Sequence, residues 1–147
     1  MPSIRSATVE DWPFIEGLLR THGLPLDGAW QHLGAFVVAE EAGAVVGTAA
    51  VEVYGDIGLL RSFAVARECR GVGLGKQLFR RVADDSRRRG LHRLFLLTTS
   101  AAPYFERFDF VQRARDTAPP PLQASAEFRG ACPASATFMA LDLSAAT

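Results

Sequence analysis

The chain has 147 residues, of which 48% are apolar and 22% are charged, a composition that is typical of one globular domain and excludes wholesale disorder. Sixteen basic and sixteen acidic residues leave a formal net charge of zero, which argues against broad electrostatic binding to nucleic acid or to an anionic membrane. No apolar run approaches the roughly 20 residues of a membrane-spanning helix, and the opening segment does not resemble a signal peptide. The two cysteines, Cys69 and Cys132, are too few for a disulfide scaffold and form no zinc-site pattern. We therefore expect one cytoplasmic domain over residues 1–147 that holds no metal.

The first part of the chain is predicted to hold four strands and one amphipathic helix. Thr8 stands three residues before Asp11, as in a capping box at a helix start, and Gly23 and Pro25 end the helix just after His22. Alternating apolar residues predict the strands, with a hairpin between the second and the third. The strands are expected at residues 3–7, 35–40, 44–54 and 59–65, with a short helix or irregular loop at residues 26–34.

The rest of the chain begins with a long helix that follows a cluster of glycines and ends near Arg89, with Gly90 as its cap. A near-continuous apolar run comes next and is typical of a strand that is buried on both faces. The further elements are strands at residues 91–98, 110–113 and 137–143, and helical pieces at residues 101–107 and 122–128. Together the elements predict an α/β fold with a mixed, mostly antiparallel sheet of six to seven strands flanked by helices.

The most informative segment is FAVARECRGVGLGK, from Phe63 to Lys76. A predicted strand ends at Val65, and three glycines then lead into the long helix. Glycines allow a ligand close to the backbone, and the free N–H groups at a helix N-terminus form a site for phosphate groups. The segment fits neither the P-loop pattern nor the dinucleotide-binding pattern G-x-G-x-x-G. A tight turn without a ligand is the alternative.

The pattern R-x-x-G-x-G at residues 70–75, after the strand Phe63–Val65, resembles the acetyl-CoA loop of the GNAT superfamily of N-acetyltransferases. The downstream pattern A-x-x-Y-F-x-x-x-x-F at residues 101–110 extends the resemblance. The resemblance implies a GNAT fold whose sheet is splayed between strands 4 and 5, where the pantetheine arm of acetyl-CoA pairs with the backbone. It also implies these cofactor-binding residues: Phe63, Ala64, Val65, Arg70, Gly71, Val72, Gly73, Leu74, Gly75 and Lys76.

The resemblance further implies direct attack of an amine on the thioester, which requires a proton acceptor and a proton donor. Glu52 is the candidate base because it is the one acid in a predicted strand of the block from Val45 to Val65, and the alternative is an exposed strand carboxylate. A glutamate that is frequent in the superfamily is replaced here by Leu59. The tyrosine that often protonates the thiolate is replaced by Phe105, so the neighbouring Tyr104 is the candidate acid, or else a packing residue.

The segment from Glu52 to Ser62 and the tail after residue 94 are similar to small bacterial arsenic-resistance N-acetyltransferases and, more loosely, to the acetyltransferase domain of N-acetylglutamate synthase. This similarity implies a small-molecule amine as acceptor, either glutamate-like or an arsenical or phosphinic analogue, and a monomer or homodimer. Arg61 is the candidate partner of an acceptor carboxylate, unless it forms an internal salt bridge with Glu52. Hydroxyl donors are expected from Thr98, Thr99 and Ser135. The alternatives are an acetyltransferase for protein or peptide amines and a non-catalytic acyl-CoA-binding module.

Overall fold

A computed structural model describes residues 2–71 and 73–144. Its centre is a mixed sheet of seven strands in the order β1-β2-β3-β4-β5-β7-β6. Every neighbouring pair is antiparallel except β4 and β5, which run parallel. The strands are β1 (Ser3–Ser6), β2 (Phe36–Glu41), β3 (Ala44–Tyr54), β4 (Ile57–Val65), β5 (Arg93–Thr98), β6 (Val111–Arg113) and β7 (Thr137–Asp142). The predicted α/β class and seven-stranded mixed sheet are confirmed.

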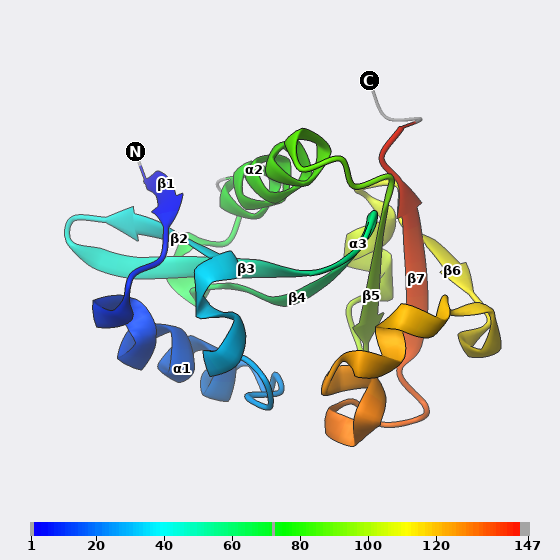
Figure 1. The fold of residues 1–147 in the computed structure, drawn as a ribbon. Helices are drawn as coiled ribbons and strands as arrows, with labels where there is room; N and C mark the ends of the chain where they lie inside the picture. The colour runs from blue at the N-terminus through cyan, green and yellow to red at the C-terminus, as the bar shows by residue number, and fades with distance from the viewer. Residues whose placement is uncertain (1, 72, 145–147) are drawn as a thin grey trace.

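Helices cover both faces of the curved sheet, with α2 on one face and α1 on the other (Figure 1). Between β6 and β7 the chain forms short helical turns that lie on the same side as α1 (Figure 1). Apolar residues on alternate positions of the strands pack under each layer, which is the expected consequence of a sheet covered on both faces. The helical elements are η1 (Val9–Asp11), α1 (Trp12–Thr21), η2 (Trp30–Ala35), η3 (Arg67–Cys69), α2 (Leu74–Arg88), α3 (Ala102–Glu106), η4 (Arg115–Thr117), η5 (Pro120–Ala124) and η6 (Glu127–Ala131).

Neighbouring residues of β4 belong to different cores. Leu60 packs under α2 with Leu78 and Leu94. Leu59 faces the other side, where Leu122 of η5 covers it. The alternation of β4 therefore divides the molecule into a helical core on one face and, on the other face, a core closed by α1 and the turns before β7.

The parallel pair β4–β5 stays in register only from Ile57↔Arg93 to Leu59↔Phe95, although both strands continue beyond these residues. The sheet is thus splayed between β4 and β5, as the resemblance implied. A register shift on the other edge of β4 lies opposite Ala49, and Ser62 there has a positive φ of 57°. Such a bulge bends a strand and redirects its side chains.

One predicted segment differs from the structure. The helical piece predicted at residues 122–128 is two short turns, a 3-10 turn η5 and a wider turn η6, with a break between them. This segment has too little helical periodicity to define its turns. Residues 26–34, predicted as a short helix or irregular loop, form a loop followed by most of the 3-10 helix η2. No helix in the described part of the chain is long and apolar enough to cross a membrane.

Candidate functional site

A cavity of about 1010 Å³ opens at the splay between β4 and β5. Five parts of the chain form its wall: the segment after α1, the diverging ends of β4 and β5, the loop before α2, α3 with its flanking residues, and the turn η6 with the residues that follow it. Because these parts belong to both faces of the sheet, the cavity leads from the start of α2 through the splay to the buried side chains under η6. Its size matches a site for a small-molecule ligand.

The loop before α2 is a glycine turn that leads directly into the first turn of the helix. Gly71 and Gly73 have φ values of 85° and 82°, which glycine adopts readily and other residues adopt at a cost. Gly73 precedes the first helical residue, Leu74, so the free N–H groups of the first turn of α2 follow directly. Arg70 and Lys76 line the cavity beside them. The predicted loop residue Val72 lies outside the described residues.

The backbone of β4 from Phe63 to Val65, which the resemblance implies as cofactor-binding, also lines the cavity. Ala64 and Val65 pair with β3 on one edge, while their other edge lies past the end of the β4–β5 register. An extended ligand chain could bind to this edge as an additional strand does.

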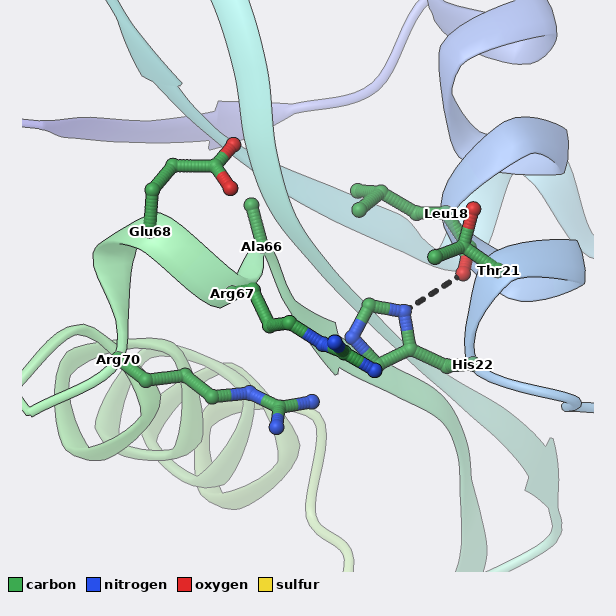
Figure 2. A pocket seen from close by; sticks show the side chains of 7 residues that line it. All are labelled: Leu18, Thr21, His22, Ala66, Arg67, Glu68 and Arg70. Carbon is green, nitrogen blue, oxygen red and sulfur yellow. Dashed lines mark hydrogen bonds between the residues drawn. The ribbon is translucent and has the colours of Figure 1, made fainter.

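A second hollow of about 670 Å³ adjoins the cavity and shares His22 and Arg70 with it. The side chains of Arg67, Arg70 and His22 extend into this hollow (Figure 2). The His22 ring lies between two carbonyl oxygens, 2.8 Å from Leu18 O and 3.0 Å from Val65 O, and so links the end of α1 to the end of β4. Two arginines and one acid, Glu68, line this hollow, so its charged side chains carry a net positive charge beside the glycine loop.

Tyr104 of α3 lies on the cavity wall, and its hydroxyl group is directed at the start of α2. A Cβ atom added to Gly75 would lie 1.9 Å from the Tyr104 hydroxyl oxygen, so a larger residue fits there only if the Tyr104 side chain moves. Aromatic contacts with Phe63, Phe105 and Phe108 fix the ring, with centroid distances of 6.0, 5.4 and 5.2 Å. Burial raises the pKa of the Tyr104 hydroxyl, which therefore carries its proton at neutral pH.

Arg61 and Glu52 form an ion pair within the sheet, with 2.8 Å between Arg61 Nη1 and Glu52 Oε2. Both side chains have no exposed surface. The guanidinium group also donates hydrogen bonds to Ser62 Oγ at 3.0 Å and to the Pro25 carbonyl oxygen at 3.1 Å. Arg61 lines the cavity, but its charge is already compensated by Glu52. The internal salt bridge, which was one of the two interpretations of Arg61, is thus present.

Glu52, the candidate base, does not line the described cavity wall. Burial by itself would raise the pKa of the Glu52 carboxyl, but hydrogen bonds from the Tyr54 hydroxyl and from Arg61 outweigh this effect and hold that pKa below its ordinary value of 4.5. A carboxylate with a lowered pKa and two charge-assisted partners is a poor proton acceptor. Its contacts are those of a residue that orients Arg61.

Glu127 of η6 is the acidic residue that does line the cavity, and sequence reasoning assigned it no role. Its side chain is 4% exposed, and its Oε2 atom lies 3.6 Å from Arg61 Nε. Oε1 has no hydrogen-bond partner within the described part of the chain. Burial raises the pKa of the Glu127 carboxyl to about 7, because desolvation, with the repulsion of Glu52, outweighs the attraction of Arg61 and a hydrogen bond with the Cys132 thiol. Its one sequence signal is that it is the sole acid between residues 117 and 141.

The three predicted hydroxyl donors have different positions. Thr98 and Thr99 line the cavity at the end of β5, and the Thr98 hydroxyl accepts a 2.9 Å hydrogen bond from the Ala101 N–H before α3. Ser135 is exposed and is not among the residues of the cavity wall. No group of three or more histidine, cysteine, aspartate or glutamate residues within the described ranges could hold a metal ion.

Comparisons with known proteins identify the family of this chain. The profile of the acetyltransferase (GNAT) family matches residues 1–110. The chain is 29% identical over 126 residues to an amino-acid acetyltransferase of Neisseria meningitidis, a match that covers 80% of this chain and 29% of that protein. It is 31% identical over 127 residues to the amino-acid acetyltransferase of Ralstonia nicotianae, with 79% and 28% of the two chains covered.

Among solved structures, N-acetylglutamate synthase from Neisseria gonorrhoeae, complexed with coenzyme A and N-acetyl-glutamate, superposes with a TM-score of 0.84 and 26% identity. The match covers 97% of this chain and 35% of that one. The chain therefore spans about a third or less of the length of these relatives.

Proposed function

The chain belongs to the acetyltransferase (GNAT) family, and we propose that it transfers the acetyl group of acetyl-CoA to the amine of a small, amino-acid-like acceptor. The family match confirms the predicted family and fold. The acceptor class is our proposal. Glutamate and its close analogues, including arsenical or phosphinic ones, are the first candidates because the relatives named above are amino-acid acetyltransferases.

The continuous cavity is the observation that carries this proposal. It begins at the glycine loop of α2, passes the unpaired edge of β4, and ends beside Arg61 and Glu127 under η6. The pyrophosphate of acetyl-CoA fits the N-terminus of α2, and its pantetheine arm fits the β4 edge. The thioester would then lie in the splay, next to polar side chains that can recognise a small acceptor. The turn η6 and Pro133 form one wall of this end of the cavity, which favours a small molecule over an extended peptide.

The residues of the cavity can support direct transfer. A free backbone N–H of β4 beyond the end of the β4–β5 register would stabilise the oxyanion, a contribution of about 3–4 kcal/mol in other acyl transfers. The amine nitrogen forms a C–N bond with the acetyl carbon as the C–S bond breaks. We propose that the Tyr104 hydroxyl, which is kept protonated by burial, supplies the proton that the leaving thiolate takes up.

The test is thiol release from acetyl-CoA with a panel of amines that contains L-glutamate, phosphinic and arsenical glutamate analogues, a lysine peptide, an α-amino peptide and a polyamine. Turnover of the amino-acid-like members alone is the expected result. Turnover of only the peptides would replace the acceptor class by a protein or peptide amine. Binding of acetyl-CoA without release of thiol by any amine would support a non-catalytic acyl-CoA-binding module and contradict the proposal.

Replacement of Gly73 by valine tests whether the loop before α2 binds the cofactor. Gly73 has a φ of 82°, which a β-branched residue adopts only with strain, and it begins the turn whose N–H groups face the phosphate site. We expect this variant to lose acetyl-CoA binding, measured by calorimetry. Acetyl-CoA at 100 times its dissociation constant should stabilise the unchanged protein by about 2.7 kcal/mol, and the variant should lack this stabilisation.

A further inference from the structure

We propose that Glu127 binds the ammonium group of the acceptor and takes its proton before the amine attacks the thioester. This inference rests on the acetyltransferase function proposed above, and it assigns the proton acceptor to a residue of the C-terminal segment rather than to the strands of the sheet.

The first support is the position of the carboxyl group. Glu127 lies on the wall of the cavity that the splay opens, together with the β4 residues Ser62 and Phe63. A group on this wall can reach an acceptor that approaches the thioester, whereas Glu52 lies behind Arg61 and is held by it. Of these two buried carboxylates, Glu127 is the one with access to the cavity.

The second support is unused hydrogen-bonding capacity. Glu52 receives hydrogen bonds from Tyr54 and Arg61, but Oε1 of Glu127 is a buried oxygen without a partner in the described residues. Buried polar atoms are nearly always paired in folded proteins, and one at a cavity wall is a candidate for a ligand contact. Because a carboxylate oxygen only accepts hydrogen bonds, its natural partner is a donor such as an ammonium group.

The third support is the balance of charge around the group. Arg61 of β4, Glu52 of β3 and Cys132 after η6 are the titratable or charged groups that act on Glu127. When both carboxyl groups are ionised, two negative charges share Arg61 as their buried cationic partner, and the His32 ring, whose Nε2 lies 3.8 Å from Glu52 Oε1, adds positive charge there only when it is protonated. A bound ammonium ion would neutralise the excess negative charge. This wall therefore attracts the cationic amine and offers no free positive charge for an acceptor carboxylate, which revises the role expected for Arg61.

The proton transfer balances in simple steps. Glu127 takes one proton from the ammonium group and later releases it to solvent. The resulting amine forms the C–N bond, and the C–S bond breaks. The thiolate takes a proton from the Tyr104 hydroxyl and leaves as the thiol. The nitrogen loses its second proton to solvent, and solvent returns one proton to Tyr104, so one proton in total is released. Burial raises the pKa of Glu127 to about 7, so that a substantial fraction is ionised at neutral pH while the carboxyl still holds a proton well, as efficient general bases require.

The decisive variant is Glu127→Gln, which keeps the shape of the side chain but cannot accept a proton. Kinetics are measured with acetyl-CoA and the panel amine that the unchanged protein uses fastest. We expect kcat/KM for the amine to fall by about 100-fold or more, with the dissociation constant of acetyl-CoA within twofold of the original. The fall of activity below pH 7 should also disappear. The variant Glu52→Gln is the control, because the carboxyl group that it removes does not reach the cavity wall. The activity of this variant should still fall below pH 7.

A second measurement does not depend on turnover. Carbon-13 NMR of labelled glutamate carboxyl groups, in the protein saturated with acetyl-CoA, should show one resonance that titrates near pH 7 and is missing in the Glu127→Gln variant. If that resonance titrates below pH 5, or if the variant keeps its activity within threefold and its acid limb, the assignment of Glu127 is overturned. If the resonance titrates near pH 7 but no panel amine is acetylated, the proton-accepting site stands and the acceptor class is the part that fails.

Discussion

Replacement of Gly75 by alanine should be destabilising only while Tyr104 keeps its hydroxyl group. The added Cβ would lie 1.9 Å from the hydroxyl oxygen and 3.3 Å from Cζ of the ring. Ordinary contact would require the hydroxyl to move by about 1.5 Å, which the surrounding aromatic rings resist. Without the hydroxyl group, the nearest ring atom would have to move by only a few tenths of an ångström.

The expected magnitudes follow from these distances. Overpacking of a fixed ring costs about 1–3 kcal/mol, so Gly75→Ala should lower the free energy of unfolding by that amount. In the Tyr104→Phe background the same change should cost nearly nothing, or even stabilise, because alanine is favoured over glycine within a helix by about 0.5–1 kcal/mol. The coupling energy between the two substitutions should therefore be about 1–3 kcal/mol.

Urea unfolding of the four proteins in this double-mutant cycle measures the coupling. Gly73→Ala is the control, since its cost arises from a positive φ and should be the same with or without the Tyr104 hydroxyl. If Gly75→Ala costs the same in both backgrounds, the hydroxyl group does not lie over the start of α2, and the position given to Tyr104 in the cavity is refuted.

Three further predictions concern charged groups. The raised pKa of Glu127 means that the folded state binds a proton more tightly than the unfolded state, so its contribution to stability falls as pH rises from about 4.5 to 7. A shift of this size amounts to about 3 kcal/mol, and pH-dependent urea unfolding should show a correspondingly flatter profile for Glu127→Gln. Arg61→Met should lower the free energy of unfolding by about 3–5 kcal/mol, because two carboxyl groups lose their buried partner. The additional change Glu52→Gln should recover part of this loss. A loss below about 1 kcal/mol would contradict the ion pair. The hydrogen bonds from Arg5 lower the pKa of Asp11 to about 2, so the stability that this pair contributes is present above about pH 4 and is lost as pH falls through about 2. Asp11→Asn should lower the free energy of unfolding by about 1–2 kcal/mol at pH 7, since solvent partly screens Arg5, whose side chain is 38% exposed. An unchanged stability in thermal unfolding would refute this prediction.

The sequence by itself determined the elements with strong local patterns. The alternation of β2, β3 and β4 and the apolar spacing of α1 repeat within a few residues, and the structure has each of these elements close to its predicted bounds. The glycine loop was equally local, because positive φ angles and a helix N-terminus depend on neighbouring residues alone. The elements without such periodicity, η5 and η6, were the ones predicted incorrectly.

Only the tertiary structure decided which charged groups meet. The bulge at Ser62 and the register of β3 with β4 place Arg61 near Glu52 on one face, and a shift of one residue would have separated them. Glu127 reaches the same place because η5 packs Leu122 on the sheet and carries the following turn over Arg61. Burial and unpaired oxygens depend on such distant contacts, so the residue best suited to accept a proton could not be recognised from the pattern of its neighbours.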